Sequence, residues 1–204
     1  MEEARIQTIK TWLDSGSINL FGRPFSGKDT QAEILSKILE APIIGGGDII
    51  RNSQNQAVKD IVGKGSLAPS QDYLNMVLPY FAQTEFRDRP IILSSVGKWS
   101  GEETRIIEAL EKSNHPLKAV VYFNFSEEQV LKRWQAAQSI GDRGSRADDD
   151  RTALDVRFDE FRNKTLPVVE FFRREGLLIE IDADQPHAKV TEDILTALFN
   201  RASA

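Results

Sequence analysis

Cysteine is absent from this chain, and histidine occurs only twice, at His115 and His187. Without cysteine the protein has no disulfide, no thiolate nucleophile and no zinc–thiolate site. The two histidines lie near the ends of predicted elements and are too few for a histidine-rich metal site. Thiol catalysis and zinc–thiolate domains are therefore excluded.

Long apolar runs and an excess of positive charge are also missing. No apolar run approaches the length of a membrane span, and the first residues begin an amphipathic segment, which is not typical of a signal peptide. The net charge of −5 argues against binding along a nucleic acid polymer but is compatible with a local cationic pocket. We therefore expect a cytoplasmic, monomeric enzyme that acts on small molecules, with no membrane and no nucleic acid polymer among its partners.

A glycine-rich loop over residues 22–30 is the most informative stretch of the sequence. It follows an apolar run at 18–21, typical of a buried strand, and precedes a predicted helix over 31–39. Strand, glycine-rich loop, lysine and helix make up the P-loop arrangement, in which backbone N–H groups and a helix N-terminus surround phosphate oxygens. Lys28 supplies a full charge for the β- and γ-phosphates. The strict pattern has Ser or Thr directly after the lysine, whereas Asp29 precedes Thr30 here.

Strands and helices alternate along the chain, which is large enough for one domain with a real core. Predicted strands cover residues 18–21, 41–44, 90–93, 117–125 and 177–181. Predicted helices start at Asp48 and Ser126 and cover residues 2–14, 31–39, 55–63, 73–86, 101–110, 148–175 and 188–201. This alternation predicts the α/β class, with a parallel five-stranded sheet and helices on both faces.

Several local features of the helices are predicted from single residues. Asp48 and Ser70 are expected to cap the helices that begin beside them. Pro79 should kink the helix over 73–86, and Pro167 should bend the helix over 148–175. A polar, glycine-containing break at 138–145 is long enough for a mobile flap.

The P-loop and the residues after it resemble the adenylate kinase family of nucleoside monophosphate kinases. Residues 22–31 and 47–51 are similar to that family's G-x-P-G-S-G-K-G-T-Q and T-G-D-[LM]-[LI]-R, at the same spacing. The similarity continues to residues 146–149 and to Arg157. The resemblance implies a P-loop kinase domain over 17–204, with a monophosphate-binding insertion at about 46–75 and a short lid at about 138–146. Residues 1–16 lie outside it and form an extra N-terminal helix.

The resemblance also implies an activity, namely Mg²⁺-dependent transfer of the ATP γ-phosphoryl group to a nucleoside monophosphate. Such transfer needs aligned phosphates and dispersed charge more than covalent chemistry. The implied catalytic residues are Lys28, Lys98, Arg146 and Arg157. The implied ATP-binding residues are Gly22, Ser26, Gly27, Lys28, Asp29, Thr30, Arg133 and Arg143. The implied monophosphate-binding residues are Gly46, Arg51, Lys98 and Glu102, and the implied metal residues are Asp29 and Thr30.

The chain departs from the family pattern where metal and transition state are bound. Ser94 stands in place of the family's metal-shell Asp, and Lys98 replaces an Arg on the acceptor phosphate. Ala137 stands in place of a lid arginine, and Arg143 inside the flap is the candidate replacement for it. Asp29 replaces a glycine, and either takes over the outer-sphere metal role or points to solvent.

Two other classes of function follow from these departures and from one further motif. A catalytically weakened nucleotide-binding module could act through a protein partner that its N-terminal helix contacts. A P-loop GTPase switch is disfavoured, because residues 163–166 lack the Asp of a guanine-reading N-K-x-D and fall inside a helix.

The acceptor base is expected to differ from adenine. The family reads adenine with a Thr and a Gln, and Gly46 and Glu102 stand at those positions. A carboxylate only accepts hydrogen bonds, so it faces adenine N1 lone pair to lone pair. GMP, CMP or a deoxy form is therefore expected to be a better acceptor than AMP. Alternatively, Glu102 caps the following helix, or Glu103 takes its place.

Overall fold

The structure is a computed structural model that describes residues 2–140 and 150–204. Its centre is one five-stranded sheet in the order β2-β3-β1-β4-β5, with every neighbouring pair parallel. The strands are β1 (Ser17–Gly22), β2 (Ile43–Gly45), β3 (Ile91–Ser94), β4 (Leu117–Asn124) and β5 (Leu178–Asp182). The α/β class and the parallel five-stranded sheet are therefore confirmed. Because all strands run the same way, their carboxyl ends meet at one edge of the sheet.

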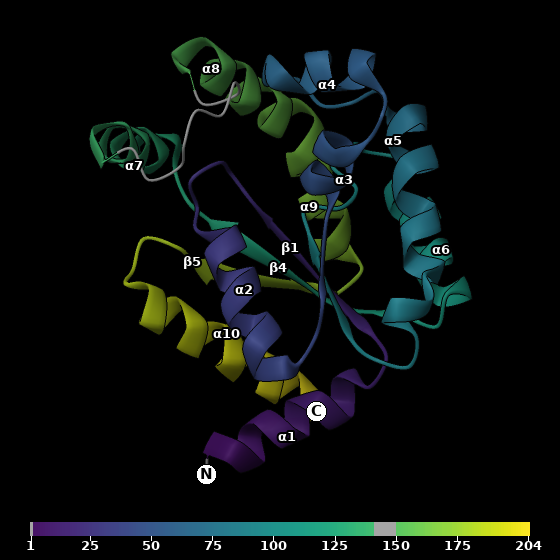
Figure 1. Cartoon of the computed structure of the whole chain (residues 1–204). Coiled ribbons are helices and arrows are strands. Elements are labelled where there is room, and N and C mark those ends of the chain that lie inside the picture. The colour runs from purple at the N-terminus through teal and green to yellow at the C-terminus, as the bar shows by residue number, and fades with distance from the viewer. Residues whose placement is uncertain (1, 141–149) are drawn as a thin grey trace.

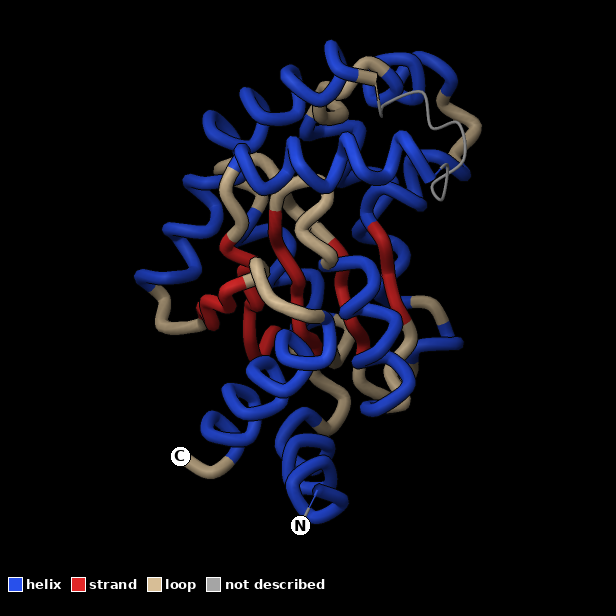
Figure 2. Tube along the Cα trace, turned by 90° about the vertical axis from the view of Figure 1, so that its left-hand side faces the viewer, coloured by secondary structure: helices blue, strands red, loops and turns tan. Residues whose placement is uncertain are grey.

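Helices cover both faces of this sheet (Figure 2). The α-helices are α1 (Glu2–Leu13), α2 (Lys28–Leu39), α3 (Gly46–Asn52), α4 (Gln56–Gly63), α5 (Ser70–Val77), α6 (Glu103–Lys112), α7 (Glu127–Ile140), α8 (Arg151–Glu160), α9 (Leu166–Arg174) and α10 (His187–Ala202). Short 3-10 turns cover Leu78–Ala82 and Thr84–Phe86, and a π-helical turn covers Phe161–Thr165. No helix of the described ranges is long and apolar enough to cross a membrane.

Alternation along the strands divides the core between the two faces. On β4, Val121 and Phe123 pack with α1, α2 and α10, whereas Val120 and Tyr122 pack with α9. This is the two-residue period of a strand buried on both sides. The predicted N-terminal helix is present as α1, beside α10 in Figure 1, and its Ile9 is fully buried.

Two predicted helix caps are wrong. Gly45 holds the N-cap position of α3, because β2 runs directly into the helix, and Asp48 lies in the first turn, where it pairs with Arg51. Pro69 holds the N-cap position of α5, and Ser70 is already helical. In both places the helix begins earlier in the chain than the predicted cap implied, at Gly46 and at Ser70.

The two helices that contain proline are interrupted, although differently from the predicted kink and bend. The α-helix after Pro69 ends at Val77, and Pro79 lies in a 3-10 turn. Pro167 follows the π-helical turn that separates α8 from α9. Proline lacks the N–H that would bond to the carbonyl four residues earlier, so the regular α-helical bonding is lost: the turn at Pro79 tightens to 3-10 and the turn before Pro167 widens to π.

The predicted flap lies mostly outside the described residues, as do Arg143, Arg146 and the predicted helix start at Asp148. The described part of the segment is still helical, because α7 continues to Ile140. On the other side, α8 begins at Arg151, and Asp150 caps it by accepting a 2.8 Å hydrogen bond from the Ala153 N–H.

Candidate active site

The loop between β1 and α2 has the backbone geometry of a phosphate-binding loop. Gly27 holds the N-cap position of α2 with a φ of 85°, a conformation that glycine adopts without strain. A Cβ at Gly22 would lie 2.5 Å from the Ser26 Oγ and 3.0 Å from the Phe123 Cβ, so the loop can fold back only over glycine. Lys28 is the first residue of α2, where the helix N-terminus favours anions.

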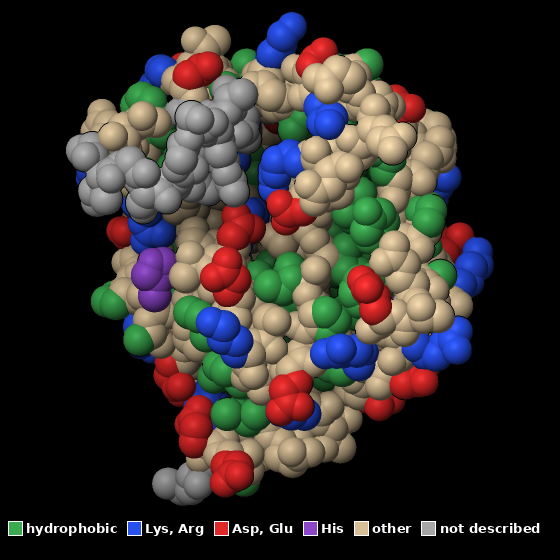
Figure 3. All heavy atoms as spheres, viewed as in Figure 1, with side chains coloured by type: hydrophobic (Ala, Val, Ile, Leu, Met, Phe, Trp, Pro, Cys, Tyr) green, Lys and Arg blue, Asp and Glu red, His purple; other side chains and the backbone are tan. Residues whose placement is uncertain are grey.

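A cavity of about 770 Å³ lies at the carboxyl edge of the sheet. Its walls come from the P-loop, α3, the segment before α5, the loop after β3, and α8. Figure 3 shows acidic and basic side chains around a hollow in the centre of this face. This volume is comparable to that of other small-molecule sites.

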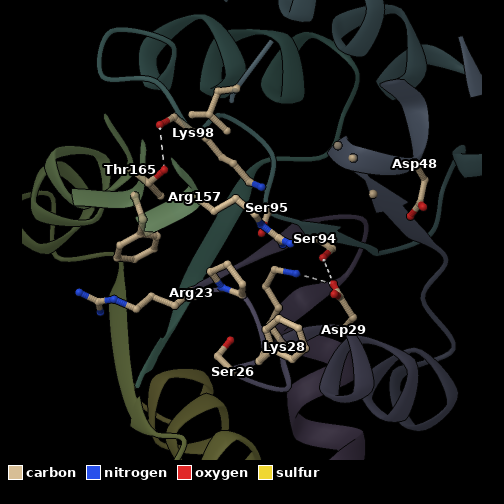
Figure 4. A pocket seen from close by; sticks show the side chains of 18 of the residues that line it. Arg23, Ser26, Lys28, Asp29, Asp48, Ser94, Ser95, Lys98, Arg157 and Thr165 are labelled. Carbon is tan, nitrogen blue, oxygen red and sulfur yellow. Dashed lines mark hydrogen bonds and ion pairs between the residues drawn. The ribbon is translucent and has the colours of Figure 1, made fainter. Parts of the chain in front are cut away.

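Cationic side chains from separate elements point into this cavity. Lys28 comes from α2, Lys98 from the loop after β3 and Arg157 from α8, and Figure 4 shows the three directed toward a common space. Burial and the positive charges of Lys28 and Arg157 lower the pKa of Lys98 to about 7. The cations lie so close together that Lys98 loses its proton near neutral pH. Such a cluster is suited to bind an anion with more than one negative charge.

Asp29 lies inside the same cluster and not away from it. Its Oδ1 accepts a 2.8 Å hydrogen bond from the Ser94 Oγ and lies 2.6 Å from the Lys28 Nζ (Figure 4). Partial loss of water raises the pKa of Asp29, but Lys28, Ser94 and Lys98 together hold that pKa well below its usual range. The carboxylate is therefore ionised and lies where bound phosphates would approach. Thr30, next along α2, also lines the cavity.

The loop after β3 is tied to β1 by hydrogen bonds. Asn19 is buried on β1, and its side chain donates to the Val96 carbonyl at 2.8 Å and accepts from the Val96 N–H at 3.4 Å. The Ser95 N–H donates to the Leu20 carbonyl at 2.9 Å. Farther along, Thr165 in the π-helical turn donates to the Lys98 carbonyl at 3.2 Å. Lys98 is thus held from both sides.

A second region of the cavity surrounds Glu102. Trp99 forms one boundary, with its indole N–H donating to the Ala68 carbonyl at 2.9 Å. Gly46 and Tyr73 form another, and a Cβ at Gly46 would lie 2.4 Å from the Tyr73 hydroxyl. Glu102 stands at the N-cap position of α6 but makes no capping bond to that helix, so the prediction that it caps α6 is wrong.

Arg133, Arg51 and His187 also line the cavity. Arg133 stacks on Phe125 at 4.0 Å and donates to the carbonyls of Phe25 and Ala183. Burial lowers the pKa of Arg133. Arg51 is 2.5 Å from the Asp48 carboxylate.

The residues predicted from the sequence are therefore brought together wherever the structure describes them. The wall also contains residues that were not predicted, among them Tyr73, Trp99 and His187. Tyr73 lies on the apolar face of its helix, so its pattern indicated core packing alone. His187 follows Pro186, just before the last predicted helix. Only its position after the last strand could have indicated that it lines the site.

Buried polar atoms give independent evidence for a ligand. Among the described residues, three buried side-chain atoms lack a hydrogen-bond partner: Arg23 Nε, Ser26 Oγ and Glu102 Oε1. All three residues line the cavity. Buried polar groups are nearly always paired, so the Ser26 and Glu102 atoms indicate a site that a ligand completes. The Arg23 guanidinium points away from the three cations in Figure 4 and donates to the Tyr122 hydroxyl and the Phe125 carbonyl.

The central strand, its P-loop and the cations over the sheet edge define a P-loop nucleotide-binding protein. Comparison with known proteins is more specific. The family model described as adenylate kinase matches residues 20–177. An adenylate kinase of Thermobifida fusca (strain YX) is 30% identical over 189 residues, 90% of this chain and 98% of that protein. An adenylate kinase of Methanocella arvoryzae is 25% identical over 209 residues, covering 88% and 96%. A uridylate kinase of Schizosaccharomyces pombe is 29% identical over 189 residues, covering 89% and 96%.

The chain belongs to the adenylate kinase family. It is accordingly a phosphotransferase of the nucleoside monophosphate kinase type, as its sequence resemblance implied.

Proposed function

We propose that this chain transfers the γ-phosphoryl group of ATP to a nucleoside monophosphate, giving ADP and a nucleoside diphosphate. The observation that best supports this reaction is the convergence of Lys28, Lys98 and Arg157 on one cavity from three elements. The transition state spreads negative charge over the transferring oxygens and needs alignment more than covalent help. Cations on separate elements can disperse that charge while the two phosphate groups stay in line.

The donor phosphates would lie on the P-loop. The backbone N–H groups from Gly22 to Gly27 and the N-terminus of α2 surround that position, and the Ser26 hydroxyl has a free bond to offer. Lys28 would neutralise the β- and γ-phosphates, and Thr30 would contact the α- or β-phosphate. Arg133 would face the donor nucleoside, with Arg143 from outside the described residues.

The acceptor phosphate would lie between α3 and the loop after β3. Arg51 and Lys98 would hold it, with Arg51 exchanging its present partner Asp48 for phosphate oxygens. Arg157 would bridge the donor and acceptor phosphates, together with Arg146 from outside the described residues. Gly46 and Glu102 would lie at the nucleoside end.

The residues present fit Mg²⁺ that is bound mainly through phosphate oxygens. Within residues 2–140 and 150–204 no group of three or more His, Asp or Glu could hold a metal ion by itself. Asp29 is ionised, lines the cavity and is held by Ser94, so it can bind a metal-coordinated water beside the phosphates. Thr30 offers a hydroxyl on the same helix. A bound Mg²⁺ ion would neutralise charge between the nucleotides.

The test is to incubate the protein with ATP, Mg²⁺ and each common monophosphate, and to separate the products by chromatography. We expect equal amounts of ADP and a nucleoside diphosphate, with little ADP when the acceptor is omitted. ATP binding without any diphosphate product would contradict transfer and support the nucleotide-binding module. We also expect the protein to be a monomer, which sedimentation would test, and to be cytoplasmic, which cell fractionation would test.

The packing of α1 bears on the alternative function, a nucleotide-binding module that acts through a protein partner. Ile9 and Leu13 of α1 are fully buried in the core beside α10, and Arg5 lies 2.7 Å from Glu192 of α10. The apolar face that could dock on a protein partner is therefore covered by the domain itself. This observation favours the kinase.

A further inference from the structure

Glu102 is a buried carboxylate with one oxygen committed to the protein and one without a partner. Its exposed fraction is 1%, and its Oε2 accepts a 3.2 Å hydrogen bond from the backbone N–H of Trp99. Its Oε1 is buried, makes no hydrogen bond of normal geometry and belongs to a residue that lines the cavity, although the Ser70 hydroxyl and the Lys98 backbone lie close enough to lower the pKa of this carboxyl. A buried carboxylate oxygen without a donor destabilises the fold, so this arrangement is favourable only when a ligand supplies the donor.

The neighbouring carboxylate does not compete for this role. Glu103 is buried and accepts a hydrogen bond from the Gly101 N–H, and it is not part of the cavity wall. Residue 46 offers no side chain, because the Tyr73 hydroxyl and the Ser95 carbonyl occupy the space beside Gly46. Of the two neighbouring carboxylates, Glu102 is therefore the one that a base in this region can reach.

The chemistry of a carboxylate restricts which base it can bind. An ionised carboxylate has acceptors only. Adenine N1 and cytosine N3 present lone pairs to it, and uracil presents a single N–H between two carbonyl oxygens. Guanine presents two adjacent donors, the N1–H and the exocyclic amino group, which match the two oxygens of one carboxylate.

We propose that Glu102 selects guanine as the base of the acceptor, so that GMP or dGMP is the preferred monophosphate. This inference rests on the proposed function and adds the identity of the acceptor to it. The guanine N1–H satisfies the free Oε1, and the amino group binds Oε2 beside the Trp99 N–H. Adenine in the same place leaves Oε1 without a donor, which is a strong basis for rejection in a buried site.

The test measures equilibrium binding of GMP, IMP, AMP and CMP to the full chain by calorimetry at pH 8. These ligands share one phosphate group, so their differences report the base. We expect GMP to bind about tenfold or more tightly than AMP and CMP, with IMP, which lacks the amino group, in between. Glu102→Gln places a donor and an acceptor in the same volume and should reverse the order of GMP and AMP. Glu103→Gln is the matched control and should leave the order unchanged.

AMP binding as tightly as GMP, or an unchanged order in Glu102→Gln, would overturn the assignment of the base. The proposed function would then still stand if any monophosphate is phosphorylated. Selective GMP binding without phosphorylation of any acceptor would instead overturn the proposed function and leave the base assignment in place.

A measurement on the unmodified protein covers the case in which the Glu102 variant does not fold. Burial raises the pKa of Glu102, and a protonated Glu102 would donate one bond and accept another, as adenine requires. The ratio of GMP to AMP affinity should therefore fall as the pH is lowered. The titratable groups that act on Glu102 are Tyr73 of α5 and Glu103 of α6, whereas Lys98 acts on the phosphate that both ligands share. A ratio that stays constant from pH 8 to pH 4.5, where a carboxyl with a pKa raised above 4.5 is more than half protonated, would overturn the proposal.

Discussion

Binding of the acceptor phosphate should be accompanied by uptake of a proton at Lys98. Burial and two neighbouring cations lower the pKa of Lys98 to about 7, against an ordinary value of 10.5. At pH 8 a group with this pKa is ~90% neutral, because the pH lies one unit above it. A phosphate dianion beside Lys98 restores its positive charge. Binding at pH 8 should then take up about 0.9 proton per site.

The same linkage fixes how affinity depends on pH. If the dianion binds the protonated form, affinity follows the protonated fraction of Lys98, which is ~50% at pH 7 and ~1% at pH 9. Affinity should therefore fall about fifty-fold between pH 7 and pH 9. The second ionisation of the ligand phosphate, with a pKa near ~6, is complete in this range and does not contribute.

The assay is calorimetry of one monophosphate in buffers of different ionisation enthalpy, since the slope of observed against buffer enthalpy gives the number of protons taken up. Lys98→Arg is the matched variant, because arginine stays charged and should bind with little proton uptake and a flat profile above pH 7. The same ligand is used on both proteins, so titration of its base cancels. Equal proton uptake by the two proteins, or uptake near zero in the unmodified protein, would refute the assigned role of Lys98.

Three further substitutions test other parts of the site and fold. Lys28→Ala should weaken ATP binding and abolish transfer while the melting temperature stays close to that of the unmodified protein; unchanged affinity and turnover would remove the P-loop assignment. Asp29→Asn should raise the Mg²⁺ concentration needed for half-maximal activity. Mn²⁺ should also bind more weakly to the complex of this variant with nucleotide. Metal titrations that superimpose on those of the unmodified protein would mean that Asp29 has no metal role. Ile9→Ala should lower the free energy of unfolding by about 2–5 kcal/mol in denaturant titrations, because the side chain is fully buried. A loss near zero would mean that α1 is a separable appendage, as a docking helix would be.

Features that depend on a few adjacent residues could be predicted from the sequence. The P-loop is one, since glycines, Lys28 and the flanking strand and helix determine its geometry within about ten residues. The parallel sheet is another, because short apolar runs between amphipathic helices leave few alternatives. The extra helix α1 also followed from its apolar face.

Features that depend on contacts between distant segments could not be predicted in this way. Asp29 and Ser94 are 65 positions apart, and only the sheet brings the two side chains together. Tyr73 fills the space beside Gly46 from another helix, although its pattern is that of a core residue. The π-helical turn before Pro167 arises where α8 and α9 must both pack while Thr165 reaches the Lys98 carbonyl. Capping predictions failed at Asp48 because a residue type alone does not show where a strand ends.

The hydrogen bonds of Asn19 have a consequence for how two bound phosphates are aligned. One strand, β1, continues into the P-loop and also holds the loop after β3 through the Asn19 side chain. The spacing between the positions proposed for the two phosphates is thereby set by the central strand of the sheet. Helix α4 takes no part in these hydrogen bonds and contains no residue proposed to hold a phosphate, so a shift of α4 would leave that spacing unchanged. A displaced α4 would therefore change the wall of the cavity before it disturbed the reacting atoms.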